Sequence, residues 1–503
     1  MDRFARMIQE APGVVRFLGA ILLAQLIMWT LVPDLLYSIL PLDALEALAW
    51  GSGFSLGNAK HPPLTGWIAG VMAILTGHAD WPIYLLSQLC TVGGAVCIYL
   101  LSREFVGRTE SALAALTPQF IFYYTVTSPE FNVNMPLLLL WPLAALFYVR
   151  ACKLDRFRDW ILLGVVCGLC FLCKYYSALL YSAFAVYLLI APERRRLLLH
   201  AGPWMAAGAF AVVVLPHAMW AVSGGLAMME AYVEKRMAFA PDANWFDRHL
   251  EGVLIVLANA ALVYLIPFAA FLLAKRALPR IPTEPDRREA ALFAAIMTGV
   301  PLVIVCCIGL SGKAMRTMWL TPLFFPAGIL LNALFPRDWT ARQRKWFCAE
   351  TALFFLASVI GVAVAGMVHP TPRKHFPAKE FTAQIESLYR EQTGEPLRIV
   401  FGDAWAAGMF RHYLPGHPQG CIRRNPCEVQ RLAPMLREFG GVAVSDDPGD
   451  IDSALETSGN PPDTPRTMFE IESRALFGKP RVKKMLVAIL APEAKPPKDP
   501  VQR

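Results

Sequence analysis

The sequence carries little charge for its length. Charged side chains account for only 17% of its 503 residues, whereas hydrophobic side chains account for 56%. A soluble protein of this size carries more charge, so the composition excludes an ordinary soluble enzyme. Apolar stretches of about 16 to 25 residues recur between Phe17 and Met367, and such stretches cross a bilayer as α-helices. The sequence therefore predicts a polytopic membrane protein that is mainly α-helical.

Two other features are also missing. The apolar stretch around Phe17 has no small-residue cleavage site, so we expect a retained span rather than a signal peptide. No basic stripe with interleaved aromatic side chains is present, which argues against a nucleic-acid partner. The net charge of +8 does not change this conclusion, because membrane proteins carry basic cytoplasmic loops.

Cysteine outside the apolar stretches is scarce. Most of the 11 cysteines lie within those stretches, where they act as small hydrophobic side chains. Cys167, Cys170 and Cys173 are spaced along one helical face, but no histidine or acid joins them, so a metal site is not indicated. Cys421 and Cys427 lie nearer the C-terminus, where an oxidising compartment would allow a disulfide and a reducing one two free thiols.

Hydropathy and loop charge together predict the topology. The ambiguous stretch is 62–77, which is short and interrupted by glycine. If it does not cross the membrane, every dense Lys/Arg cluster between spans falls on the cytoplasmic side; if it crosses, the later clusters fall outside. We therefore expect about eleven spans, a cytoplasmic N-terminus, and a juxtamembrane helix at 62–77 on the outer face. The candidate spans are 14–32, 81–102, 110–127, 133–151, 159–173, 176–191, 202–221, 251–273, 290–310, 317–335 and 347–367.

Ionisable side chains gather at the predicted outer edge of the membrane. Asp43, Glu46, Lys60 and His61 follow the first span, and charge at such a boundary is costly and often functional. In a helix, Asp43 and Glu46 would share one face. That pattern fits either a site for chemistry on a lipid headgroup or an amphipathic helix whose polar face is exposed to solvent. The predicted topology brings further residues to the same side: Glu130, Lys174, Lys313 and Arg316.

The composition changes after His369, where long apolar runs stop and polar residues and proline become common. We expect a transmembrane domain at 1–368, a small α/β domain at 369–491 on the periplasmic side, and a disordered tail at 492–503. Short strands are predicted at 397–402 and 442–445, and helices at 381–392 and 429–439.

Several motifs, taken in order, resemble glycosyltransferase family 39, which includes bacterial relatives of the protein mannosyltransferases and of the lipid A aminoarabinose transferase. The motifs are Asp43-x-x-Glu46-x-x-x-Trp50-Gly51; Lys60-His61-Pro62-Pro63-Leu64 with Trp67; Pro129-Glu130-Phe131-Asn132-x-Asn134; Lys174-Tyr175; and Lys313-x-x-Arg316 with Trp319. The resemblance covers about 43–330. The family often has adjacent acids in its first loop, whereas here Ala44 follows Asp43.

The resemblance implies a fold of the GT-C type and a glycosyltransferase of the bacterial inner membrane. Such an enzyme takes a sugar from a polyprenyl (undecaprenyl) phosphate on the periplasmic face. Its partners would be that donor, the bilayer, and a lipid, polysaccharide or protein acceptor of the cell envelope.

The resemblance also implies roles for the acids. Asp43 is the expected general base, with Glu46 and Glu130 as its partners. Two nearby carboxylates raise each other's pKa, which would help one of them hold or pass a proton. Alternatively, Glu46 or Glu130 binds the acceptor, or Glu130 only caps a helix.

Cationic side chains can bind the donor phosphate, because an arginine guanidinium forms two parallel hydrogen bonds to phosphate oxygens and a lysine ammonium provides a localised positive charge. We expect Lys174, Lys313 and Arg316 to bind it, unless these side chains only reach towards lipid headgroups. His61 either joins them or begins a helix. The lipid groove is expected to be lined by Trp50, Tyr175, Tyr176 and Trp319, although an aromatic belt would also explain these residues.

No obligatory metal is expected, although a divalent ion is possible because acids and His61 would share the site. A transporter or flippase of lipid-linked sugars is the alternative; it should show internal repeats and broken helices near the midplane, and no repeat is visible. A third possibility is a membrane-anchored binding protein that works through its C-terminal domain. Such a protein would not need Asp43, Glu130 and Lys174 on one side.

Overall fold

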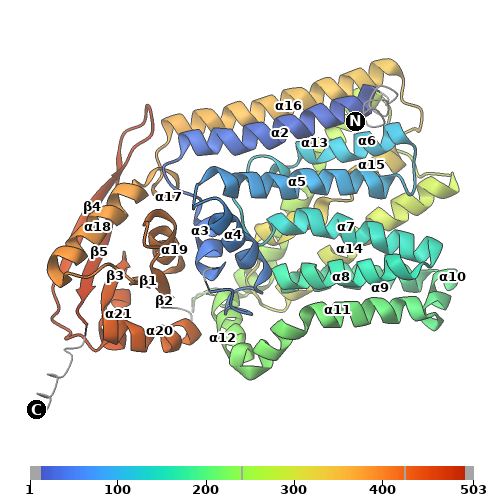
Figure 1. Ribbon diagram of the computed structural model, residues 1–503. Helices are drawn as coiled ribbons and strands as arrows, with labels where there is room; N and C mark the ends of the chain where they lie inside the picture. The colour runs from blue at the N-terminus through green and yellow to red at the C-terminus, as the bar shows by residue number, and fades with distance from the viewer. Residues whose placement is uncertain (1–12, 52, 240–241, 424–425, 493–503) are drawn as a thin grey trace, which may run out of the picture. The chain divides into compact units, whose positions relative to one another are not determined.

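The computed structural model describes residues 13–51, 53–239, 242–423 and 426–492 (Figure 1). Within them the chain forms two compact units. The first unit takes in 13–32, 60–64 and 84–362, and the second takes in 33–59, 65–83 and the described residues from 363 on. The second unit therefore combines residues from both of the domains predicted from composition, 1–368 and 369–491. Those two domain boundaries stay a prediction.

The first unit is helical, and its longer helices run roughly along one direction in Figure 1. Its α-helices are α2 (Gly13–Leu36), α5 (Trp81–Ser102), α6 (Arg108–Leu116), α7 (Met135–Leu154), α8 (Phe157–Cys173), α9 (Ala178–Ile190), α10 (Pro192–Arg195), α11 (Ala201–Trp220), α12 (Leu226–Met237), α13 (Gly252–Lys275), α14 (Pro285–Leu310), α15 (Ala327–Leu334) and α16 (Ala341–Val368). Short 3-10 or π segments are η1 (Thr117–Phe120), η2 (Phe122–Tyr124), η3 (Tyr175–Ser177), η4 (Arg196–Leu199), η5 (Ala221–Gly225), η6 (Asp247–Glu251) and η7 (Thr317–Phe324).

Seven helices among the described residues are long and apolar enough to cross a membrane, or up to nine if each of two bent pairs is one span. The pairs bend by 111° between η3–α9 and α10–η4, and by 58° between η7 and α15. A polytopic, mainly α-helical fold is thus confirmed. The count of about eleven spans stays a prediction: the candidate at 159–173 is α8, with 17 residues, and that at 110–127 is broken into α6, η1 and η2.

The stretch 62–77 contains α4 (Leu64–Leu75), a helix of 12 residues. At about 1.5 Å per residue it is roughly 18 Å long, short of the ~30 Å hydrocarbon core. It is therefore too short to cross alone, as the juxtamembrane prediction requires. Its position along the outer face stays a prediction.

Buried glutamines from two long helices support the irregular backbone that follows η1. Gln25 of α2 donates to the carbonyl of Tyr124 at 2.9 Å, and Gln88 of α5 donates to the Ser128 hydroxyl at 3.1 Å. Gln119 donates to the side-chain oxygen of Gln25, and all three amides are at most 1% exposed. Irregular backbone within a membrane domain is tolerated where protein groups satisfy it. Gln25 does so for the carbonyl of Tyr124, and the other two glutamines hold Gln25 and Ser128.

The second unit combines a five-stranded sheet with helices, in the order β2-β1-β3-β5-β4. Strands β1 (Ile399–Gly402), β2 (Gln419–Ile422) and β3 (Gly441–Ser445) are parallel, whereas β5 (Arg481–Leu490) pairs antiparallel with β3 and β4 (Arg466–Ser473). Its helices are α3 (Leu42–Gly51), α4, α17 (Pro372–His375), α18 (Ala378–Thr393), α19 (Ala404–Tyr413), α20 (Pro426–Phe439) and α21 (Pro448–Ser458).

The predicted α/β fold of this region is confirmed, because β1, β3, α18 and α20 fall where the sequence placed them. The sequence did not predict β2, β4, β5, α19 or α21. Cys421 lies buried in β2, but the side chain of Cys427 lies outside the described residues, as does the tail 493–503, so the disulfide and the disordered tail stay predictions.

Glycines let α3 approach α4 and α19 at backbone distance. A Cβ on Gly51 would collide with the carbonyl of Gly66, and one on Gly408 would collide with the carbonyl of Leu45. A Cβ on Gly70 would lie 2.9 Å from the carbonyl oxygen of Gly51. The helix that carries Asp43 and Glu46 is therefore fixed by backbone contacts within the second unit.

We expect Gly51→Ala to lower the free energy of unfolding by about 1–3 kcal/mol, because the backbone that meets the new methyl group cannot rotate away. The measurement is thermal unfolding of the full chain in detergent. Gly19→Ala is the control, since a Cβ there meets nothing within 4 Å. Equal melting temperatures for the two variants would contradict the close crossing of α3 and α4.

Candidate active site

Helix α3 presents its acids on one partly exposed face. Asp43 lies in its first turn, Glu46 follows one turn later and Trp50 another turn on, and all three are half-buried. The residues between them, Ala44, Leu45, Ala47, Leu48 and Ala49, are buried. The prediction that both carboxylates share one face of a helix is confirmed. Their catalytic roles stay predictions.

Lys174 is a buried cation at the end of α8. It is 8% exposed, and its Nζ donates to Oδ1 of Asn134 at 2.8 Å. The same Nζ lies 5.1 Å from the centre of the Tyr176 ring. A lysine that anchors to headgroups keeps its ammonium in water. The lipid-anchoring alternative is therefore wrong for Lys174.

The loop 129–134, PEFNVN, brings Asn134 to Lys174. Asn132 accepts a 2.8 Å hydrogen bond from the backbone N–H of Asn134, and its amide donates to the carbonyl of Glu130 at 2.9 Å. Helix α7 begins at Met135, with Asn134 as its N-cap residue. The alternative that Glu130 caps this helix is therefore wrong. The sequence contained Asn134 within a motif, but its role was missed because its partner lies forty positions away.

His61 is half-buried in the segment 60–64. Burial lowers its pKa well below the usual 6.5, and the nearby charges of Lys60, Lys174 and Arg236 lower this pKa further. The imidazole is therefore neutral at neutral pH and lies in a positive region. Of these surrounding cations, the sequence had indicated a phosphate role only for Lys174. Helix α4 begins three residues later, at Leu64.

The aromatic residues divide into two groups. Tyr176 lies near Trp319, with ring centres 6.3 Å apart, and so belongs with Lys174. Tyr175 turns towards α11, where its hydroxyl lies 2.8 Å from Nε2 of the buried His217. Tyr176 and Trp319 are thus brought together as predicted, and the lipid groove itself stays a prediction.

Lys313 and Arg316 lie in the connection between α14 and η7, and both side chains are exposed. The carbonyl of Arg316 accepts a 3.1 Å hydrogen bond from the backbone N–H of Trp319, which fixes the start of η7. Their exposure keeps both alternatives open, the phosphate and the lipid headgroups.

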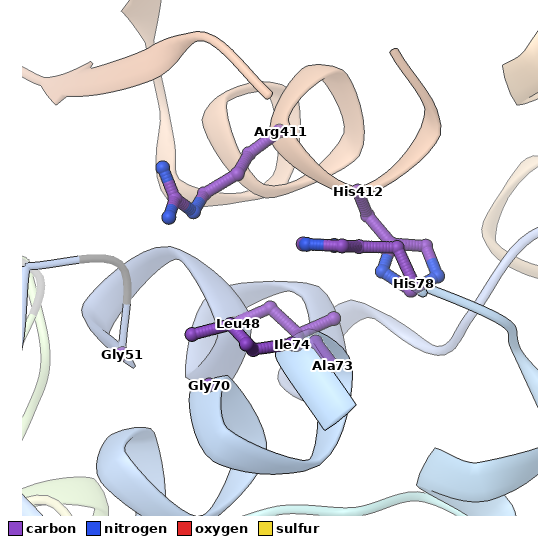
Figure 2. Close-up of a pocket in the computed structure, with 8 residues that line it drawn as sticks. All are labelled: Leu48, Gly51, Gly70, Ala73, Ile74, His78, Arg411 and His412. Atoms are coloured by element: carbon purple, nitrogen blue, oxygen red, sulfur yellow. The ribbon is translucent and has the colours of Figure 1, made fainter. Parts of the chain in front are cut away.

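Within the described part of the chain, no group of three or more His, Cys, Asp or Glu side chains is arranged to hold a metal ion. A small pocket lies between α3, α4 and α19, with Arg411 and His412 on one side and Leu48 and Ile74 opposite (Figure 2). Its volume is about 10 Å³, enough for about one water molecule. This pocket is too small for a sugar or a lipid phosphate.

We expect His61→Gln to reduce the loss of stability on acidification. In the wild type the unfolded imidazole takes up a proton near pH 6.5 while the folded one does not, so this group lowers the free energy of unfolding as pH falls below 6.5. Glutamine cannot titrate. Melting temperatures from pH 7.5 to 5 should therefore fall less for His61→Gln than for the wild type or for a variant of the exposed His369, His369→Gln. An equal fall would show that His61 titrates normally.

Comparison with known proteins agrees with these motifs. Residues 60–220 match the family model described as dolichyl-phosphate-mannose-protein mannosyltransferase. The lipopolysaccharide core galacturonosyltransferase RgtB of Rhizobium johnstonii is 23% identical over 75% of this chain and 77% of its own length. RgtA of the same organism, also a lipopolysaccharide core galacturonosyltransferase, is 22% identical over 82% of this chain and 83% of its own length.

The fold has a counterpart among solved structures. ArnT from Cupriavidus metallidurans, in its crystal structure bound to undecaprenyl phosphate, superposes with a TM-score of 0.60 at 15% identity, covering 95% of this chain and 98% of that one. The chain is therefore a multi-pass membrane protein with the ArnT-like GT-C fold, and its resemblance to the membrane glycosyltransferases of family 39 is confirmed.

Proposed function

We propose that this protein is a membrane glycosyltransferase that moves a sugar from a polyprenyl phosphate, such as undecaprenyl phosphate, to an acceptor of the cell envelope. The buried ammonium of Lys174 carries the proposal. A charge at membrane depth is costly and marks a functional site. Its Nζ donates to an amide oxygen and lies near an aromatic ring, and the positive charges of Lys174, Lys60 and Arg236 all act on His61. Such a region favours an anionic ligand.

The relatives support this donor class and indicate the acceptor class. RgtA and RgtB are named for transfer of galacturonic acid to the lipopolysaccharide core. A third relative, from Pectobacterium atrosepticum, is an undecaprenyl phosphate-alpha-4-amino-4-deoxy-L-arabinose arabinosyl transferase, 29% identical over 32% of this chain and 30% of its own length. We infer a hexose or pentose donor and a lipid, polysaccharide or protein acceptor.

The proposed chemistry exchanges one bond for another at the anomeric carbon of the sugar. The bond to the phosphate oxygen breaks, a bond to the acceptor hydroxyl oxygen forms, and the hydroxyl proton passes to Asp43. Lys174 stabilises the negative charge that develops on the departing phosphate, with Lys313 and Arg316 as further candidates. Because these side chains supply the positive charge, we propose that no metal is obligatory.

The orientation in the membrane is part of the proposal. Dense Lys/Arg clusters lie on the cytoplasmic side if α4 does not cross, and the short length of α4 supports that arrangement. The N-terminus is then cytoplasmic, and the site and the C-terminal α/β region face the periplasm of a bacterial inner membrane.

A transporter of lipid-linked sugars is the second candidate. The two bent helix pairs favour it, because broken helices build transporter sites. A transporter moves the lipid across vesicles without breaking the sugar–phosphate bond. Movement of an intact labelled donor without transfer to any acceptor would establish that function instead.

We expect Asp43→Asn to abolish sugar transfer while leaving donor binding nearly intact, because asparagine keeps the shape of the side chain but cannot accept the proton. The assay is transfer from a synthetic polyprenyl-phosphate sugar to envelope lipids in detergent, with donor affinity measured in parallel. Glu46→Gln is expected to have a smaller effect. Normal turnover of Asp43→Asn would remove this residue from the mechanism.

We expect Lys174→Met to reduce turnover by about a hundredfold or more, because methionine fills the same volume without stabilising the departing phosphate. The matched control is Lys153→Met, since Lys153 also lies near an aromatic ring, 4.5 Å from the centre of Phe105, but on a predicted cytoplasmic loop. Equal turnover of the two variants, both folded, would show that the Lys174 charge plays no part.

A further inference from the structure

We propose that the segment 474–480, which joins β4 to β5, enters the surface of the lipid bilayer. In this hairpin tip, Leu476 and Phe477 contact the lipid chains, and the neighbouring cations contact anionic headgroups. The proposal assigns a membrane-binding surface to the α/β region of the second unit. It goes beyond the proposed function, because it does not depend on sugar transfer.

Strands β4 and β5 form a long hairpin that extends beyond the sheet (Figure 1). Strand β4 pairs with residues 481–488 of β5, whereas β3 pairs only with 486–490. Among the described residues, the half of the hairpin nearest the tip is therefore a ribbon of two strands. Such a ribbon is at best marginally stable in water. The tip therefore needs a support outside the sheet.

The end of α16 gives the tip one support. The backbone N–H of Phe477 donates to the carbonyl of Met367 at 2.8 Å. This carbonyl is one of the last in α16, and such groups have no partner within their own helix. A Cβ on Gly478 would collide with the carbonyl of Val368 and with the ring of Pro370. The tip thus approaches the helix end at backbone distance, within the second unit.

Two candidate membrane spans end at this place. Helices α2 and α16 are both long and apolar enough to cross a membrane, and they end at Leu36 and Val368. A Cβ on Gly366 would lie 3.4 Å from the side chain of Leu36 and 3.1 Å from the ring of Tyr37. The Lys374 ammonium lies 4.8 Å from the centre of the Tyr37 ring. Tyrosine and lysine are typical of the membrane–water boundary, so the tip lies at the level of that boundary.

The tip presents two large apolar side chains to its surroundings. Leu476 is 72% exposed and Phe477 is 74% exposed. On the last turns of α16, Val364 and Val368 are also exposed, as expected for a helix face in contact with lipid. The apolar surface of the span therefore reaches the helix end that the tip contacts. This continuity with a lipid-facing surface favours the bilayer as the partner of the tip.

The charges of the tip are complementary to an anionic membrane surface. Between 472 and 481 the sequence has three cations, Arg474, Lys479 and Arg481, and one acid, Glu472. Arg474 donates to Glu472 at 3.0 Å, whereas Lys479 and Arg481 add two exposed positive charges. Long cationic side chains keep their charge among the headgroups while apolar neighbours enter the lipid chains. Anionic lipids attract such a cluster.

The experiment places trifluoromethylphenylalanine in the full chain at Phe477 or, as a matched control, at Met468. Met468 is 50% exposed on the same hairpin, but it pairs with Leu486, in the part of β5 that β3 also pairs with. Fluorine NMR spectra are recorded in phospholipid nanodiscs, with either a nitroxide on the lipid chains or a water-soluble gadolinium chelate. We expect the nitroxide to broaden the signal from 477 at least about threefold more than that from 468, and the gadolinium chelate to do the reverse.

A second arm replaces part of the phosphatidylcholine in the nanodiscs with anionic phosphatidylglycerol. The lipid-dependent broadening at 477 should increase, and Lys479→Gln combined with Arg481→Gln should abolish the increase. Arg466→Gln combined with Lys484→Gln is the control, because it removes two exposed cations from the same hairpin away from the tip. This control should retain the increase, and both double variants should keep the melting temperature of the wild type.

Broadening at 477 by the gadolinium chelate alone would show that the tip lies in water and would overturn the inference. Protection of 477 from both agents would also overturn it, because a protein surface, such as a second copy of this chain, would then cover the tip. Lipid contact that does not respond to phosphatidylglycerol would overturn the role of the cations. None of these outcomes bears on sugar transfer, so the proposed function is tested separately.

Discussion

The cost of an ammonium in a protein interior is the constraint on which the first unit depends. Lys174 is almost fully buried, and such a charge needs polar partners that are already in place. The chain supplies them by stopping α8 at Cys173 and by bringing the PEFNVN loop alongside. At the end of α8 the carbonyl of Cys170 accepts from the backbone N–H of Lys174 and from the hydroxyl of Ser177, so the break is satisfied within the chain segment that follows it.

A second polar cluster serves the other broken span. Arg287 of α14 pairs with Glu110 of α6 at 2.7 Å, and its guanidinium also donates to the carbonyls of Asn332 and Phe335, where α15 ends. Removal of either charged partner would leave the other buried and uncompensated, which is strongly destabilising. Polar side chains thus join helices α6, α14 and α15.

Hydropathy predicted most of the helices, and the spacing of Asp43 and Glu46 predicted α3, because both signals are local. The break after α6 was not predicted, since the hydropathy of 110–127 indicated one span and the polar support of the break comes from Gln25 and Gln88, far away in sequence. The pairing of Lys174 with Asn134 was missed for the same reason. The association of α3 with the α/β region depends on backbone contacts at glycines, which no periodicity reveals. Strand β4 was missed because its largely exposed residues give no apolar run.

Neutral amides make several of the buried polar contacts in the first unit. Gln25, Gln88 and Gln119 support the irregular backbone, and Asn132 and Asn134 support the site. An amide offers both a donor and an acceptor without a net charge, so its burial costs less than that of a carboxylate or an ammonium. Asp43 and Glu46, which the proposed chemistry uses, are carried by α3, a helix folded into the second unit.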